Sequence, residues 1–136
     1  MDDLEKIAAI SIDCGLKLHE QIGPGLLESV YEILLAHSLK ERGLFVERQK
    51  VIPITFNGIT LDEGFRADII IENKLIIEIK SVEKLSAVHG KQVLTYLRLM
   101  DMPLGILINF GEELFKSGLR RVANNYYGNW KSSASS

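Results

Sequence analysis

The sequence is poor in the features that mark several common classes of protein. Its single cysteine, Cys14, cannot form an intramolecular disulfide, so we expect a reducing compartment, the cytoplasm. No run approaches the roughly 18 to 20 uninterrupted apolar residues of a membrane helix. The acidic start, "MDDLEKIAAI", lacks the basic residues and long apolar core of a signal peptide. These absences predict a cytoplasmic protein with no membrane partner.

Excess positive charge is also missing. The formal net charge is −2 at pH 7, which does not suggest a strongly basic polyanion-binding protein. The charges are unevenly distributed, however, because no acidic residue follows Glu113. The bases beyond it are Lys116, Arg120, Arg121 and Lys131. This segment is either a phosphate-contacting surface or a solvated helix face.

The chain also lacks a glycine-rich phosphate-binding loop. Gly23-x-Gly25 has no third glycine at the spacing of a dinucleotide fingerprint, and a predicted helix precedes it. A length of 136 residues suits one domain with one sizeable core. We predict a single domain over 1–130, followed by a disordered low-complexity tail, "KSSASS", at 131–136.

Apolar periodicity predicts helices at about 4–21, 24–42 and 86–100. A long extended segment at 44–56 meets the hairpin signal Asn57-Gly58, which leads into a short strand at 59–61. "RADIIIE" and "KLIIEIKSV" form an antiparallel pair turning near Asn73, and "PLGILINF" is a central strand. We expect 112–127 to form a turn followed by a short helix or irregular structure. The order predicts an α/β fold with a mixed central sheet flanked by helices.

The stretch "FRADIIIENKLIIEIKSVEK", at 65–84, places charged residues inside apolar strands. Alternation puts Glu78 and Lys80 on one face of their strand. A hairpin turning near Asn73 pairs residues whose numbers sum to about 146 or 147, which sets Asp68 almost opposite Glu78. Two carboxylates so close repel each other unless a cation lies between them. Mg²⁺, with Mn²⁺ as a substitute, is the cation that we expect there.

The same three residues suit metal-assisted attack of water on a phosphodiester. Lys80 would orient or deprotonate the water and stabilise negative charge on a phosphoryl oxygen. The alternative is a salt-bridge ladder on a solvated sheet face, in which Lys80 pairs with Asp68 or Glu78. The pattern D-x9-E-x-K alone does not decide between the two.

These residues resemble the active-site motif of the PD-(D/E)xK nuclease superfamily, and within it the small GxxExxY proteins. The signature of that subfamily is similar to Gly25-Leu26-Leu27-Glu28-Ser29-Val30-Tyr31. Further similar segments up to Asn124 are "GPGLLESVYE", "KQVLTYLRL", "GILINFG" and "GLRRVAN". Ala67 precedes Asp68, where the wider superfamily often has proline, and the GxxExxY proteins share this alanine. The resemblance implies a restriction-endonuclease-like core of the order α-β-β-β-α-β.

The resemblance also implies roles for individual residues. Asp68 and Glu78 would be metal ligands, Lys80 the catalytic lysine and the carbonyl of Ile79 a further ligand. Glu28 would reach the metal directly or through water. From the sequence alone, Glu28 could equally be an ordinary exposed residue.

Gln92 matches a glutamine that often joins the site on the helix after the E-x-K strand. His89, Gln92 and Tyr96 lie on one line of that predicted helix, as contacts to a nucleic-acid backbone or to Lys80 would require. The alternatives are a hydrogen-bonded or exposed His89 with no chemistry, and a Tyr96 that is part of the core.

We therefore expect a metal-dependent nuclease that acts on DNA or RNA. The second hypothesis is a nuclease-fold binding or assembly module with little catalysis, because clustered bases are few. A homodimer could merge two weak basic patches. The bases of such patches are Lys84, Lys91, Arg98, Arg120 and Arg121, and the candidate nucleic-acid contacts are His89, Tyr96, Lys84, Lys91, Arg120 and Arg121.

Overall fold

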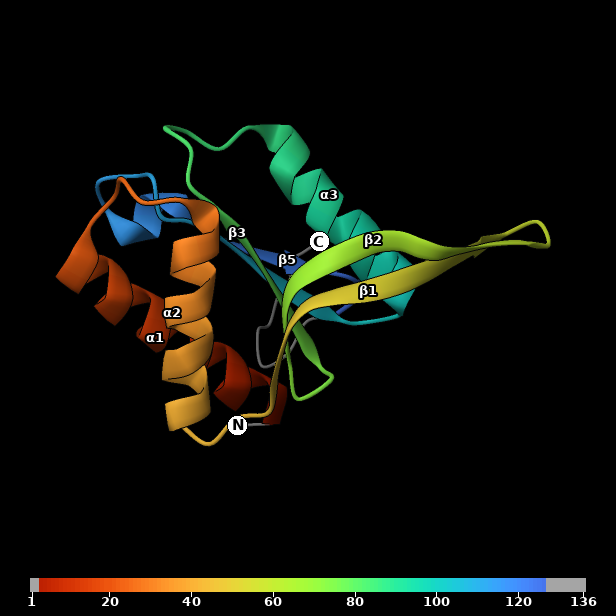
Figure 1. Cartoon of the computed structure of the whole chain (residues 1–136), viewed down its shortest axis with the longest axis horizontal. Helices are drawn as coiled ribbons and strands as arrows, with labels where there is room; N and C mark the ends of the chain where they lie inside the picture. The colour runs from red at the N-terminus through yellow and green to blue at the C-terminus, as the bar shows by residue number, and fades with distance from the viewer. Residues whose placement is uncertain (1–2, 127–136) are drawn as a thin grey trace.

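A computed structural model describes residues 3–126 as three α-helices and a five-stranded sheet, with a short 3₁₀ helix (Figure 1). The predicted α/β class is confirmed, and the restriction-endonuclease-like order α-β-β-β-α-β runs from α2 to β4. The elements are α1 (Asp3–Ile22), α2 (Glu28–Glu41), β1 (Val46–Phe56), β2 (Ile59–Ile71), β3 (Leu75–Lys80), α3 (Ala87–Met100), β4 (Leu104–Asn109), η1 (Phe115–Gly118) and β5 (Leu119–Ala123).

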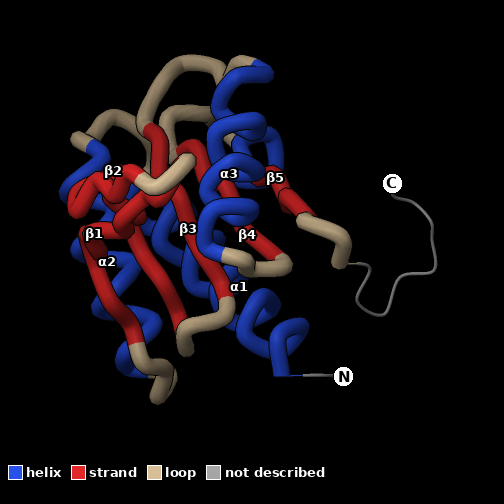
Figure 2. Tube along the Cα trace, turned by 90° about the vertical axis from the view of Figure 1, so that its right-hand side faces the viewer, coloured by secondary structure: helices blue, strands red, loops and turns tan. Residues whose placement is uncertain are grey.

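The sheet has the order β1-β2-β3-β4-β5 and is mixed. Strands β1, β2 and β3 are antiparallel, β3 and β4 are parallel, and β5 is antiparallel to β4. Helices α1 and α2 cover one face and α3 covers the other (Figures 1 and 2). Every residue of β4 is buried, as predicted for a central strand between two helical layers.

Tight turns set the register of the antiparallel strands: two residues separate the paired Phe56 and Ile59, and three separate the paired Ile71 and Leu75. Asn57 and Gly58 have φ of 47° and 80°, and Glu72 and Asn73 have φ of 54° and 55°. Positive φ at both central residues is the property of the type I′ turn, which suits tight hairpins. Both predicted hairpins are therefore confirmed.

Helix α2 begins at Glu28, four residues later than predicted. The residues before it are not helical: Gly25 has a positive φ of 119°, which glycine tolerates, and Leu27 is extended, with φ of −70° and ψ of 152°. The hydroxyl of Tyr31 holds this segment, because it donates to the carbonyl of Gly23 at 2.6 Å and accepts the N–H of Leu26 at 3.1 Å. Apolar periodicity counts Leu27 among the core-facing residues of this helix, which is wrong, since Leu27 lies before the helix and is 73% exposed. Gly43 follows the helix at the C′ position with φ of 84°, a conformation that glycine adopts without strain.

Two strand predictions were also wrong in part. The residues after Asn57-Gly58 form one continuous strand, β2, in which Asp62 to Gly64 bulge opposite Pro53 and the pairing resumes on either side, at Leu61 with Ile54 and at Phe65 with Ile52. Strand β5 and η1 lie where we expected a turn and a short helix or irregular structure. The predicted tail at 131–136 and the domain end at 130 fall outside the described residues. Within residues 3–126, no helix has the length and apolar character needed to cross a bilayer.

Candidate active site

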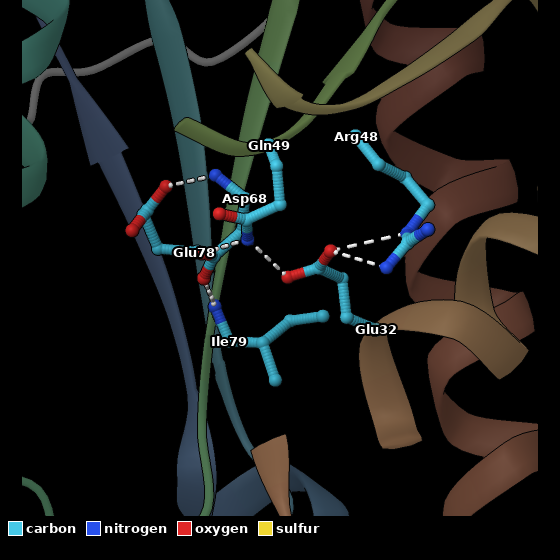
Figure 3. Close-up of polar contacts among 6 residues, drawn as sticks. All are labelled: Glu32, Arg48, Gln49, Asp68, Glu78 and Ile79. Atoms are coloured by element: carbon cyan, nitrogen blue, oxygen red, sulfur yellow. Dashed lines mark hydrogen bonds and ion pairs between the residues drawn. The ribbon is translucent and has the colours of Figure 1, made fainter. Parts of the chain in front are cut away.

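Strands β2 and β3 stop pairing at the position of the two predicted acids. Their ladder runs from Ile71 opposite Leu75 to Ile69 opposite Ile77, so paired numbers sum to 146 as predicted. Beyond that pair, the main-chain hydrogen bonds between the two strands are replaced by hydrogen bonds from the main chain of one strand to a side chain of the other. The N–H of Asp68 donates to Oε2 of Glu78 at 2.9 Å, and the N–H of Ile79 donates to Oδ2 of Asp68 at 2.8 Å. Figure 3 shows each carboxylate bonded to the main chain of the opposite strand.

Strands β1 and β2 bend at the same place. Residues an even number apart on a regular strand share a face. Here, however, Val46 packs into the core beneath α1 and α2, whereas Ile52 packs into the core beneath α3. Ile69 and Ala67 are divided between the two cores in the same way. Figure 1 shows the bend of both strands.

Gln49 and Asp68 lie between these residues, at the reversal. Gln49 has φ of 51°, which is unusual for a non-glycine residue in a strand. The local distortion thus turns polar side chains toward the point where β2 leaves β3.

Burial makes this cluster of acids electrostatically costly. Burial, and next to it the carboxylate of Asp68, raises the pKa of Glu78 from 4.5 to about 8. The N–H of Asp68 and the ammonium of Lys80 oppose this rise. Burial also raises the pKa of Asp68 itself. Because Glu78 is only 4% exposed, it is not part of a solvated face.

The alternative of a salt-bridge ladder is therefore excluded for this sheet face. Lys80 is half-buried at the end of β3, and its positive charge lowers the pKa of both acids. Among residues 3–126, no ion pair within 4.0 Å joins Lys80 to Asp68 or Glu78.

Tyr96 of α3 lies close to the same acids. Burial raises the pKa of its hydroxyl, and the carboxylates of Glu78 and Asp68 raise it further. Its ring stacks on that of Phe65 with centroids 4.0 Å apart. Tyr96 is thus packed against Phe65 and also adjacent to the site. The sequence left open whether Tyr96 is a core residue or a residue of the site, and both descriptions apply.

Glu28 lies at the first turn of α2, facing the loop after β3. Its Oε2 accepts the N–H of Ser81 at 3.3 Å, and the hydroxyl of Ser81 donates to the carbonyl of Leu26 at 2.7 Å. The charge of Glu28 also raises the pKa of Asp68. Glu28, Ser81 and their neighbours line a hollow of about 400 Å³. The predicted helical acid is thus brought beside the site.

The sequence analysis missed three polar residues that join the cluster. Glu32 of α2 is 4% exposed, and its carboxylate accepts hydrogen bonds from Arg48 and Gln49 of β1 (Figure 3). Gln49 also donates to Oδ1 of Asp68 at 3.2 Å. One signal could have found Glu32: it lies four residues after Glu28 and therefore on the same helix face.

His89 and Gln92 are less closely tied to the acids. His89 Nδ1 accepts the N–H of Ser86 at 3.1 Å and forms a capping box at the start of α3. This is the hydrogen-bonded histidine that the sequence analysis left as an alternative. Gln92 is exposed on α3, one turn before Tyr96.

The predicted basic contacts lie in different places. Lys84, Lys91 and Arg98 are exposed on α3 and the loop before it. Lys91 and Arg120 share a hollow of about 610 Å³ between α3 and β5. Arg121 also lines that hollow, but its guanidinium is ion-paired with Glu5 of α1 and lies over the ring of Tyr126. The structure does not bring the five bases into one patch.

The donor set fits a hard divalent cation. Asp68 and Glu78 supply carboxylate oxygens from strands that have separated, and each carboxylate keeps lone pairs beyond its hydrogen bond to a main-chain N–H. The described residues contain no group of three or more His, Cys, Asp or Glu side chains arranged to hold a metal. Mg²⁺ is commonly bound by one or two carboxylates while keeping several waters, so a pair of acids is sufficient.

Comparison of the sequence with models of known protein families places the chain in one family. The family model described as PD-(D/E)XK nuclease superfamily matches residues 5–122. The chain belongs to this superfamily. Neither the comparison with curated proteins nor the comparison with solved structures gave a significant match.

Membership in the PD-(D/E)XK superfamily indicates a nuclease-like protein with a nucleic-acid substrate. Nucleases of this superfamily generally use divalent metals. The matched range includes α2, β2, β3 and α3, which carry all the acids of the cluster together with Lys80 and Tyr96.

Proposed function

We propose that this protein is a Mg²⁺-dependent nuclease of the GxxExxY type that hydrolyses phosphodiester bonds of DNA or RNA. The observation that carries the proposal is the separation of β2 from β3 at Asp68 and Glu78. The carboxylates of buried Glu78 and half-buried Asp68 meet there beside the ammonium of Lys80, in a chain of the nuclease superfamily. A pair of like charges with so little solvent is unfavourable, and a bound cation would explain why the two acids lie together.

Each residue has a chemical role in this proposal. Asp68, Glu78 and the carbonyl of Ile79 would hold the cation, and Glu28 would reach it directly or through water. When bound, the cation would stabilise the negative charge that develops on the phosphoryl oxygens. As an ammonium, Lys80 would orient the attacking water and stabilise negative charge on a phosphoryl oxygen; to take the proton of the water it would first have to lose its own and act as the neutral amine. Gln92 and Tyr96 face the substrate from α3, with Tyr96 beside the acids.

Substrate contacts come from exposed bases around the site. Lys84 lies on the loop after β3, and Lys91 and Arg120 line one hollow. Arg121 is not among these bases, because its guanidinium pairs with Glu5 of α1, across the sheet from α3. The single buried Cys14 suits a reducing compartment, and we propose the cytoplasm as the location.

A cleavage assay tests the proposal. Purified protein is incubated with single-stranded, double-stranded and branched DNA and RNA, with Mg²⁺, with Mn²⁺ or with EDTA. We expect metal-dependent cleavage that Lys80→Ala and Asp68→Ala each reduce by at least about 100-fold. Glu83→Ala, at an exposed residue outside the cluster, is the control and should cleave normally. Equal activity in wild type and Lys80→Ala contradicts the proposal.

One observation favours a second candidate, a nuclease-fold binding or assembly module. The net charge is −2 and the exposed bases are scattered, so a monomer has little surface for phosphate contacts. A homodimer would double that surface. Light scattering of the eluting protein and a titration with Mn²⁺ separate the two candidates. A dimer that binds no Mn²⁺ and cuts no substrate supports the module, whereas Mn²⁺ binding that Glu78→Ala abolishes supports the nuclease.

A further inference from the structure

Gln49 connects a buried acid on α2 to the central acid of the site. We infer that Glu32 and Gln49 form a positioning relay, which fixes the orientation of the Asp68 carboxylate and so determines how tightly the site holds a divalent cation. This inference rests on the proposed function. Neither residue is itself placed among the metal ligands.

Glu32 is fixed on both of its oxygens. Its side chain is 6% exposed, and its Oε1 accepts a hydrogen bond from Nε2 of Gln49 at 2.7 Å. Its Oε2 accepts a hydrogen bond from Nε of Arg48 at 3.1 Å and lies 3.0 Å from Nη2 of the same guanidinium. A buried carboxylate held by a two-pronged guanidinium has a well-defined orientation. Glu32 is therefore a rigid anchor for whatever else it contacts.

Gln49 transmits that rigidity to Asp68. Its side-chain amide has two N–H groups, so Nε2 can donate both to Glu32 and to Oδ1 of Asp68, at 2.7 and 3.2 Å. The other oxygen of Asp68 accepts the N–H of Ile79. Both oxygens of Asp68 are thereby oriented by one donor each, and about half of the carboxylate's lone pairs remain for a cation. Figure 3 shows this chain of contacts.

The backbone of β1 is distorted at the residue that makes the link. Gln49 adopts φ of 51° where the strand reverses its faces. Positive φ at a non-glycine residue is unfavourable and is found where other contacts compensate for it. The two hydrogen bonds of the Gln49 amide are such contacts.

The relay is distinct from charge neutralisation. Gln49 is neutral and adds hydrogen bonds but no charge, although its hydrogen bond to Glu32, like the guanidinium of Arg48, opposes the rise in the pKa of Glu32 that burial causes. The Gln49 amide is the group that contacts both carboxylates. Groups that orient metal ligands typically change metal affinity or activity by about 10–100-fold when removed.

A calorimetric titration with Mn²⁺ tests the relay in the full chain. Gln49→Met keeps the length of the side chain and removes the amide. Lys50→Met, at the next residue, is the matched control, because within residues 3–126 the Lys50 ammonium pairs with half-buried Glu47 and with no acid of the site. We expect Gln49→Met to raise the dissociation constant for Mn²⁺ by about 10–100-fold, and Lys50→Met to change it by less than about threefold.

Kinetics separate positioning from a general structural effect. In Gln49→Met, the Mn²⁺ concentration for half-maximal cleavage should rise by the same factor, while the KM for nucleic acid stays unchanged. Unaltered Mn²⁺ binding in Gln49→Met, or equal weakening in both variants, overturns the relay. If wild type binds no Mn²⁺, the proposed function is contradicted. The inference that the relay determines metal affinity is then contradicted as well.

A measurement on metal-free wild type applies even if Gln49→Met does not fold. Hydrogen exchange of side-chain amides, followed by NMR, should show the Gln49 amide protected at least about tenfold relative to that of Gln21, which is exposed like Gln49 but makes no side-chain hydrogen bond within residues 3–126. Exchange of Gln49 at the rate of Gln21 would show that the link to Glu32 and Asp68 does not form in solution.

Discussion

Glu78→Gln should stabilise the metal-free protein at alkaline pH, although it removes a proposed metal ligand. Glu78 is 4% exposed and its pKa is raised from 4.5 to about 8, with burial as the main cause. The folded state therefore holds a proton on Glu78 in a pH range where the unfolded chain has released it. The contribution of protonated Glu78 to the free energy of unfolding is fully present below pH 4.5 and is lost as the pH rises to about 8.

The size of the effect follows from the same two pKa values. The interval spans about 3.5 pH units, and each unit corresponds to about 1.4 kcal/mol, so the loss amounts to at most about 5 kcal/mol. Gln at this position keeps an oxygen that can accept the N–H of Asp68 and carries no charge. The variant should therefore lose most of this pH dependence.

Urea unfolding in EDTA, at intervals from pH 5 to pH 8.5, measures this directly. Wild type should lose several kcal/mol of unfolding free energy across the range relative to Glu78→Gln, and the variant should be the more stable protein at pH 8.5. Glu83→Gln, at an exposed residue, should follow wild type. Parallel profiles for wild type and Glu78→Gln would refute the account of a buried, uncompensated carboxylate.

Two further predictions concern the scaffold of the site. Tyr31→Phe removes the hydroxyl that holds the segment before α2, and urea unfolding should show a loss of about 1–3 kcal/mol; an unchanged midpoint would contradict this. Gly105→Ala would place a methyl 2.7 Å from Cγ1 of Val93 and 2.8 Å from Cγ2 of Ile76, so calorimetry should show a lower melting temperature from about 1–3 kcal/mol of overpacking. A melting temperature equal to that of wild type would mean that α3 moves aside freely.

Local chemistry explains which parts of the fold were predictable. Asn57-Gly58 and Asn73 carry turn information in their own backbone preferences, so both hairpins and the register of Asp68 and Glu78 followed from the sequence. The apolar β4 was equally clear. Strand β5 was not, because its two arginines are exposed at a sheet edge and its burial alternates only weakly.

The missing part of the site depends on tertiary structure. Gln49 reaches Glu32 and Asp68 from a backbone conformation with φ of 51°, which no preference of glutamine predicts. Glu32 appeared to be an ordinary polar residue beside Tyr31. Its burial becomes visible only when β1 packs against α2 and supplies Arg48. A sequence pattern therefore identified the acids that the motif contains, and could not identify the residues that orient them.

A crystal soaked in Mn²⁺ tests the central claim most directly, because the anomalous signal of the metal locates it without reference to activity. The account predicts an anomalous peak where β2 separates from β3, with oxygens of both Asp68 and Glu78 in its coordination shell. Saturating Mn²⁺ with no peak at this position, and with both carboxylates still bonded to the opposite main chain, would contradict it.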